Sequence, residues 1–239
     1  MAEIENAEHP YPRPLSGAKV GHLPLTLEPL DAARHAGDLF EASHGSEAAL
    51  RIWDYLPWGP WNSEEEYTKV LRQQTARHDQ VYYAVRPAAG GKACGQTSFL
   101  DIQPEQGVIE IGSIWFGLSL RRTRSATESI YLMLRYAMDD LGYRRMQWRC
   151  NGLNAASRAA ARRLGFRFEG IFYNHMIFKG QNRDTAWYSI LDDEWPEVRE
   201  IMERWVAPSN FDQDGTAKTS LGVLMGQRGP SRRGEMSAK

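Results

Sequence analysis

The chain has 239 residues, of which 42% are hydrophobic and 25% are charged, and its formal net charge is −1 at pH 7. This length and composition are those of one enzyme-sized domain that can bury a core. A net charge near zero excludes an overall electrostatic attraction to nucleic acid or to a membrane surface, so we expect neither as a partner.

The number of cysteines and the sequence of the N-terminus indicate the cellular compartment in which the protein is expected. Cys94 and Cys150 are the two cysteines, too few for a disulfide framework, although one bond between them stays open. No apolar N-terminal run resembles a signal peptide or a membrane span. We therefore expect a cytoplasmic protein.

The first part of the chain predicts an arm and the start of a domain. Residues 1–19 are expected to form an extended arm. The alternating pattern of residues 23–30 predicts the first strand. Asp31 then follows as a preferred N-cap for a helix that ends near Ser43.

The next segment predicts a helix and three strands. A capping box at 63–66 starts a helix that runs to about His78. Residues 81–86 and 93–101 predict a hairpin across a glycine-containing turn, and residues 108–116 predict the following strand.

The second half of the chain alternates helix and strand before it ends in a hairpin. Helical periodicity covers 127–142, and residues 167–179 and 185–191 predict the hairpin strands. A short helix at 194–205 closes a domain that spans residues 20–206, and residues 207–239 are expected to form a mobile tail. The predicted fold is α/β (α+β), with a mixed, mostly antiparallel twisted sheet of about seven strands and helices on both faces.

An arginine-rich turn lies directly before the 127–142 helix. Its residues are Arg121, Arg122, Thr123, Arg124, Ser125 and Ala126. The first-turn N–H groups of a helix lack intrahelical partners and attract anions, so this turn predicts a phosphate site. A second helix opens with Asn154 and Ser157, whose spacing puts both side chains on one face. The two motifs together indicate a ligand that carries phosphates at one end and amide groups along its length. Coenzyme A has both features.

These motifs resemble those of the GNAT-superfamily N-acetyltransferases, and most closely the branch of the ribosomal-protein N-terminal acetyltransferases. The matching residues are Arg121, Ala126, Thr127 and Glu128 in the phosphate loop, and Asn154, Ser157, Leu164-Gly165-Phe166 and Glu169-Gly170 in the second signature. Arg124 stands where the family has its central glycine. The resemblance covers roughly residues 20–206.

The resemblance implies the GNAT fold, with acetyl-CoA as co-substrate and no metal. It implies that the strand at 108–116 splays from its neighbour, so that the main chain of Ile114, Trp115 and Phe116 contacts the pantetheine arm. It also implies that Asn154 contacts the pantetheine amides. Read from the residues alone, the arginines could instead form a solvated face, and Asn154 could be a helix cap.

Catalysis requires a neutral amine, because only its lone pair attacks the thioester carbonyl. Glu110 lies among apolar residues on the expected cofactor strand and is the candidate base, the alternative being a glutamate that faces solvent or caps a neighbour. Many members of the superfamily protonate the leaving thiolate with a tyrosine, but that position here is Ala161. Ser157 is the remaining candidate for a hydrogen bond to the coenzyme sulfur.

The acceptor site is expected between two segments rich in aromatic and polar residues. Trp53, Tyr55 and Trp58 are candidate wall residues, although clustered aromatic residues can equally be core. Arg183, near the last hairpin turn, could bind an acceptor carboxylate, or could pair with Asp184 or Asp193. We expect a primary amine of a small molecule or a peptide N-terminus as acceptor, and leave a homodimer open.

Two other classes of function stay in view. A non-catalytic coenzyme-A-binding or regulatory module is suggested by Arg124 and by the missing tyrosine. A nucleic-acid-binding domain could use the same arginines, but aromatic residues are not interleaved with them, which disfavours that function.

Overall fold

The computed structural model describes residues 15–16, 25–87 and 91–229. Most of the predicted arm lies outside these residues. So do residues 88–90 of the predicted hairpin turn and the last ten positions of the predicted tail, 230–239.

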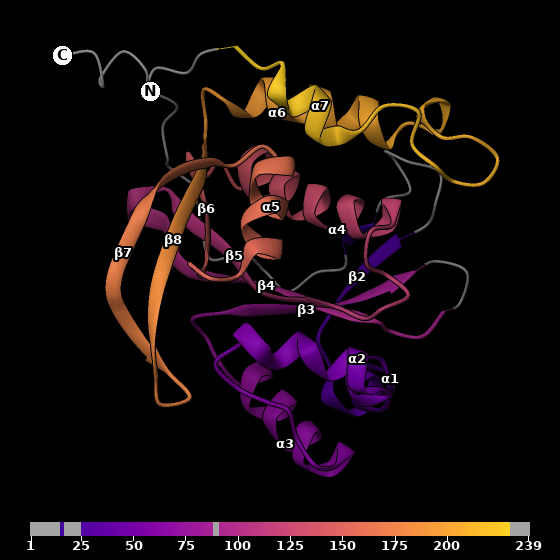
Figure 1. Ribbon diagram of the computed structural model, residues 1–239, viewed down its shortest axis with the longest axis vertical. Helices are drawn as coiled ribbons and strands as arrows, with labels where there is room; N and C mark the ends of the chain where they lie inside the picture. Colours follow the sequence, from indigo (N-terminus) through magenta and orange to yellow (C-terminus); the bar gives the residue numbers. More distant parts are fainter. Residues whose placement is uncertain (1–14, 17–24, 88–90, 230–239) are drawn as a thin grey trace.

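The described residues form a mixed sheet with the strand order β1-β2-β3-β4-β5-β6-β8-β7 (Figure 1). Its strands are β1 (Leu15–Ser16), β2 (Leu25–Pro29), β3 (Val81–Pro87), β4 (Gly95–Gln103), β5 (Val108–Phe116), β6 (Arg145–Asn151), β7 (Arg167–Phe178) and β8 (Gln181–Leu191). Neighbouring strands are antiparallel except for β5 and β6, which run parallel. The prediction of a mixed, mostly antiparallel sheet is confirmed.

Helices cover both faces of this sheet (Figure 1). The first face carries α1 (Ala32–His44), α2 (Glu47–Leu50), the 3₁₀ helix η2 (Arg51–Tyr55) and α3 (Glu64–Thr75). The second face carries α4 (Arg124–Arg135), its π-helical end η4 (Tyr136–Asp140), α5 (Ala155–Arg163), α6 (Trp195–Val206) and α7 (Leu221–Gly226). Short 3₁₀ turns, η3 (Pro104–Gln106) and η5 (Pro208–Asn210), lie in the connections.

Side-chain caps fix where the helices begin. Asp31 accepts hydrogen bonds from the N–H groups of Ala33 and Arg34 at 2.8 and 3.0 Å, which confirms the predicted cap of α1. The hydroxyl of Thr123 likewise accepts the N–H of Ala126 at 3.1 Å. Helix α4 therefore begins at Arg124 and not at Thr127, so the arginine turn reaches into the helix itself.

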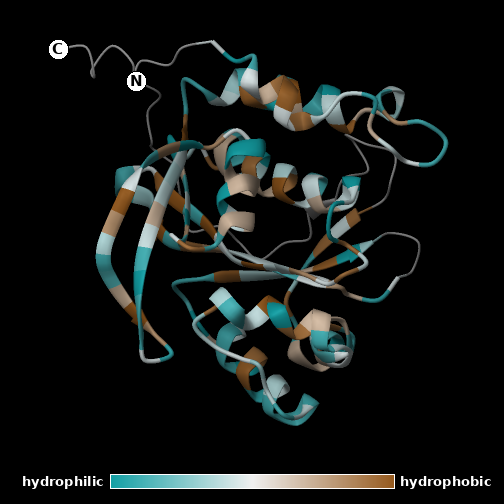
Figure 2. Ribbon diagram, in the orientation of Figure 1, coloured by the Kyte–Doolittle hydropathy of each residue, from teal (hydrophilic) through white to brown (hydrophobic). Residues whose placement is uncertain are grey.

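Strand alternation sends side chains into two separate cores. Figure 2 shows hydrophobic residues in the strands and in the helices on both sides of the sheet. In β3, Tyr83 and Val85 join the larger core beneath α4 and α6. Tyr82 and Ala84 point the other way, into a smaller core with residues of α1, η2 and α3. Strand β3 is therefore buried on both faces, and the site lies farther along the sheet, where two strands separate.

The chain after Val206 is packed against the domain. Leu221 and Met225 of α7 are buried in the larger core, and α7 packs against α5 and α6. Arg228 donates to the carbonyl oxygen of Gly165 at 2.6 Å. The prediction of a mobile tail is therefore wrong for residues 207–229. Two apolar side chains four positions apart form a buried helical face that the glycine- and serine-rich composition concealed.

Candidate active site

The site begins where the two parallel strands diverge. Their register runs only from Val108–Arg145 to Glu110–Gln147, although both strands continue beyond these pairs. On its other edge β5 carries a bulge, because Gly112 and Trp115 pair with Ser98 and Gln96 of β4 while the two residues between them have no register partner. The predicted splay of this strand is confirmed, and it leaves main-chain groups free for a ligand.

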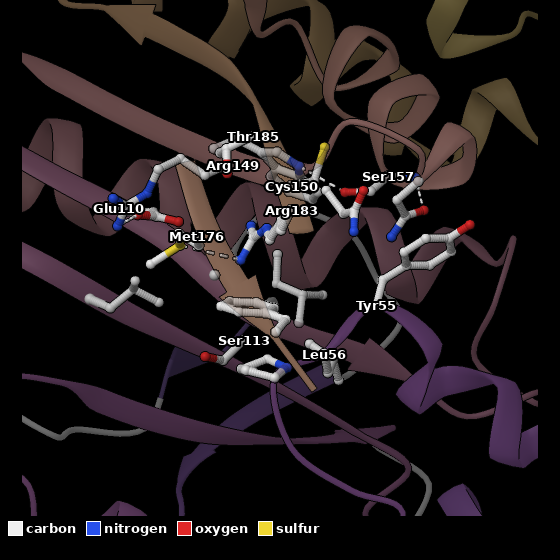
Figure 3. Close-up of a pocket in the computed structure, with 18 of the residues that line it drawn as sticks. Tyr55, Leu56, Glu110, Ser113, Arg149, Cys150, Ser157, Met176, Arg183 and Thr185 are labelled. Atoms are coloured by element: carbon white, nitrogen blue, oxygen red, sulfur yellow. Dashed lines mark hydrogen bonds and ion pairs between the residues drawn. The ribbon is translucent and has the colours of Figure 1, made fainter. Parts of the chain in front are cut away.

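A cleft of about 260 Å³ opens at this divergence (Figure 3). Its walls come from the β5 bulge, the end of β6, the start of α5, the segment after η2 and the β7–β8 hairpin. The lining residues used below are Tyr55, Trp58, Glu110, Ser113, Ile114, Arg149, Cys150, Asn154, Ser157, His175, Met176, Phe178 and Arg183.

Glu110 lies at the floor of this cleft and is only 3% exposed. Its carboxylate forms an ion pair with Arg149 of β6, which also contacts Asp101 of β4 at 3.3 Å. Burial raises the pKa of Glu110 to about 7, although the positive charge of Arg149 opposes the rise. The alternative of a glutamate that faces solvent is therefore wrong. A carboxyl with this pKa in a cleft can exchange a proton near neutral pH.

Arg149 was not among the predicted site residues. Its side chain meets Glu110 because β5 and β6 run parallel and pair at Glu110–Gln147. Nothing in the sequence around Arg149 signals that register, since arginine on a strand is ordinarily a solvated residue. Ser113, which has a φ of 51° in the bulge, was also missed, because nothing in its sequence signals a bulge between β4 and β5.

The two predicted residues of α5 both reach the cleft. The side-chain oxygen of Asn154 accepts the N–H of Ser157 at 3.0 Å, so the asparagine is a helix cap as well as a lining residue. The indole N–H of Trp148 donates to the Ser157 hydroxyl oxygen at 3.0 Å. That hydroxyl therefore keeps its own hydrogen for another acceptor.

The predicted phosphate turn retains the features of an anion site. Arg121 and Arg122 are exposed, and Arg121 donates to the carbonyl oxygen of Phe116 at 2.9 Å. Arg122 adopts a φ of 62°, a left-handed conformation that is uncommon for a residue other than glycine. At the start of α4 the N–H of Ala126 is capped, while those of Arg124 and Ser125 have no acceptor within the helix. These two N–H groups and the two exposed guanidinium groups can meet an anion.

Arg124 points inward, unlike the exposed Arg121 and Arg122. Its guanidinium donates to the carbonyl oxygen of Val206 and lies 4.9 Å from the ring centroid of Phe211. It is thus engaged with the packed C-terminal segment, whose composition predicts a tail. The buried Glu128 lies beneath it with a pKa raised to about 7 by burial. Glu128 is not a lining residue of the cleft, so of these two glutamates only Glu110 combines a raised pKa with access to the cleft.

The three predicted aromatic wall residues separate into two groups. Trp53 is 1% exposed and packs on Trp61, Tyr67 and Trp115 in the smaller core, so its assignment to the acceptor wall is wrong. Tyr55 and Trp58 line the cleft. Tyr55 ends the 3₁₀ turn that contains Trp53, and Trp58 follows this turn and packs against the edge of the smaller core. Composition alone could not distinguish these positions.

Arg183 of β8 lies in the cleft (Figure 3). Its guanidinium lies 4.2 Å from the ring centroid of Phe178 and donates to the Met176 sulfur at 3.8 Å. The neighbouring Asp184 instead accepts from the Asn174 backbone N–H at 2.8 Å and the Asn182 side chain at 3.0 Å. Asp184, one of the two aspartates considered as a partner of Arg183, is therefore not paired with it.

Both cysteines are buried and free, which excludes the disulfide left open by the sequence. Cys150 lines the cleft, and burial raises the pKa of its thiol. Within the described ranges no helix is long and apolar enough to cross a membrane.

Comparisons with known proteins agree with this geometry. A solved GCN5-related N-acetyltransferase from Brucella melitensis is 41% identical, with 92% of this chain and 96% of that chain covered and a TM-score of 0.86. A curated Bacillus subtilis protein named "Putative ribosomal N-acetyltransferase YdaF" is 25% identical over 171 residues, 71% of this chain and 90% of that protein.

The fold is also shared with microcin C7 self immunity acetyltransferase MccE, solved in complex with acetyl-CoA and AMP. That structure is 21% identical, with 72% of this chain and 94% of that chain covered and a TM-score of 0.62. The family model for the acetyltransferase (GNAT) domain matches residues 24–167. The chain belongs to the GNAT acetyltransferase family.

Proposed function

We propose that the protein transfers an acetyl group from acetyl-CoA to a primary amine by direct attack in a ternary complex. The observation that carries this proposal is Glu110, a buried carboxyl with a pKa of about 7 at the floor of a cleft between diverging strands. A non-catalytic coenzyme-binding module has no need for such a group, because a buried titratable carboxyl costs stability.

The coenzyme would follow the free edge of β5. The pyrophosphate would lie over residues 121–126, held by the free N–H groups of Arg124 and Ser125 and by the side chains of Arg121 and Arg122. The pantetheine arm would pair with the main chain of Ile114, Trp115 and Phe116, where the β6 register has ended. Asn154 and Ser157 line the same cleft from the opposite wall and would contact its thioester end.

The reaction needs two protons removed from the nitrogen and one developing charge stabilised. Glu110 would accept the first proton, that of the ammonium, directly or through a water, and the neutral amine would then attack the thioester carbonyl. As the N–C bond forms, a free N–H near Ile114 or Trp115 would bind the developing oxyanion. When the oxyanion collapses the C–S bond breaks, and the second proton of the nitrogen ends on the sulfur, so that coenzyme A leaves as a thiol. The Ser157 hydroxyl would donate a hydrogen bond to the sulfur while it departs.

The acceptor would enter between Tyr55 and Trp58 on one side and the β7–β8 hairpin on the other. A small-molecule amine and a peptide N-terminus both fit this description. The Bacillus subtilis relative, named for ribosomal acetylation, favours the peptide. We place the reaction in the cytoplasm and leave the oligomeric state open.

Acetyl-CoA binding is the primary test of this proposal. Isothermal titration should give a measurable heat, and ligand should raise the melting temperature by mass action. Arg121→Ala and Arg122→Ala should each weaken binding by about tenfold, the effect of losing one charge-assisted hydrogen bond. Arg204→Ala, on the exposed surface of α6, is the matched control and should change nothing. The absence of both heat and thermal shift at millimolar acetyl-CoA would exclude the proposal.

The pH dependence of kcat/KM tests the assigned base. The rate should rise as the pH passes through about 7, because Glu110 accepts a proton only when ionised. Asp101→Asn should move this rise to lower pH, since the negative charge of Asp101 is one cause of the raised pKa of Glu110. The profile is measured with two acceptors whose amines differ in pKa. A rise caused by Glu110 stays at the same pH for both acceptors, whereas a rise caused by the amine moves with the acceptor. A profile without a common rise near pH 7 for both acceptors would contradict the assignment.

A further inference from the structure

Arg183 has no ion-pair partner among the described residues. Its charge interacts with that of Glu110 only at longer range, and its direct contacts are with a thioether sulfur and an aromatic ring. Its Nε–H is shielded from solvent and has no hydrogen-bond partner among the described residues. A guanidinium left in this state gains free energy when an anion supplies the missing acceptors.

The other charged groups of the cleft are already engaged. Arg149 contacts the carboxylates of Glu110 and Asp101, and lies 4.9 Å from the ring centroid of Trp187. His175 is bonded through Nδ1 to the Thr185 hydroxyl at 3.0 Å. Arg183 therefore gives the cleft an excess of positive charge beside the Glu110–Arg149 pair.

We infer that the acceptor amine carries an anionic oxyacid group, a carboxylate or a phosphate, and that Arg183 binds this group. The inference rests on the proposed acetyl transfer and names the class of its acceptor. An amine without such a group would meet an uncompensated cation, and a polyamine would be repelled by it.

The surroundings of Arg183 suit this role. Stacking on Phe178 holds the guanidinium plane, and an anion can replace the Met176 sulfur, which is only a weak acceptor. The planar fork then offers two parallel N–H donors to two oxygens, which a lysine could not do. Figure 3 shows Arg183 between the Glu110–Arg149 pair and the side of the cleft that carries Ser157 and Tyr55.

The same position assists the chemistry. The guanidinium and the Glu110 carboxylate lie close enough to interact electrostatically. An acceptor whose anion is bound at Arg183 therefore has its amine near the base.

The test compares matched acceptors in a thiol-release assay with acetyl-CoA. The pairs are C-terminally amidated Asp-Ala-Ala with amidated Asn-Ala-Ala, alanine with alaninamide, and phosphoethanolamine with ethanolamine. Each rate is divided by the fraction of the acceptor whose amine is neutral at the assay pH. The wild type should favour the anionic member of at least one pair by about tenfold or more in kcat/KM. The first two pairs report a carboxylate and the third a phosphate.

Substitution of Arg183 then assigns the preference. Arg183→Gln should reduce it to about onefold, because kcat/KM falls far more for the anionic member than for the neutral one, and Arg183→Lys should restore it in part. Arg199→Gln, which alters a surface ion pair with Asp139, is the matched control and should keep the wild-type preference. Melting temperatures show whether Arg183→Gln is folded. If it is not, the inference is judged on the acceptor preference of the wild type and of Arg183→Lys.

Three outcomes would overturn the inference. One is equal kcat/KM for both members of every pair, and another is an equal loss for both members in Arg183→Gln. The third is an unchanged preference in Arg183→Gln together with a pH profile of kcat/KM that shifts to higher pH for all acceptors. Arg183 would then act by lowering the pKa of Glu110 and not by binding the acceptor. Acetyl transfer without preference overturns this inference alone, whereas failure to bind acetyl-CoA overturns the proposed function.

Discussion

Glu110→Gln is expected to lower kcat/KM by about 10²–10⁴-fold, the effect of losing a positioned proton acceptor. Glutamine keeps the size of the side chain but cannot accept the proton of the ammonium. The affinity for acetyl-CoA should stay unchanged, since the proposed coenzyme contacts lie farther along β5. The measurement is steady-state kinetics with one acceptor, alongside titration of acetyl-CoA.

Asp101→Asn is the matched control for this substitution. It also removes one carboxylate from Arg149, but Asp101 does not line the cleft. Asp101 has a φ of 49°, a conformation that asparagine tolerates well. The control should therefore stay folded and retain most activity. If both variants lost activity equally, the ion pair would be structural and Glu110 would not be the base.

Trp53→Ala is expected to lower the free energy of unfolding by about 3–5 kcal/mol, the usual cost of removing a large aromatic side chain from a core. Trp53 contacts His44, Trp61, Tyr67 and Trp115, so its loss leaves a cavity between η2, α3 and β5. Chemical denaturation monitored by circular dichroism measures the change.

Trp58→Ala should behave differently, because Trp58 is only partly buried and lines the cleft. We expect a higher KM for the acceptor, an unchanged affinity for acetyl-CoA and a smaller loss of stability than for Trp53→Ala. If Trp58→Ala weakened both ligands equally, Trp58 would belong to the core. If Trp53→Ala left stability intact, the assignment of Trp53 to the core would be wrong.

The fold was predictable wherever its signals are local. Asp31 and Ser63 cap the helices that their sequences predict, and the run 108–116 forms one strand with the predicted bounds. Glu110 could be found because its apolar neighbours indicate a buried strand. Arg149 could not, since its place beside Glu110 depends on the register of two parallel strands separated by a helix.

The errors have a common physical cause. Trp53 and Trp58 are equally aromatic, and only the turn of the backbone decides which one is core. Arg124 and Arg121 are equally basic, but the packed segment after Val206 draws one of them inward. Sequence gives the chemistry of each side chain, whereas its direction depends on partners far away along the chain.

The divergence of β5 from β6 also bears on how this family evolves. In the proposed complex the coenzyme is held along β5 by backbone N–H and carbonyl groups, which every residue except proline supplies alike. Substitutions at Ile114 or Phe116 are then constrained by packing and not by the ligand. The acceptor is met by side chains from separate segments, such as Trp58 and Arg183. Relatives that share an ancestor can therefore change their acceptor by a few point mutations. The cofactor they share places little constraint on which side chains stand beside it on β5.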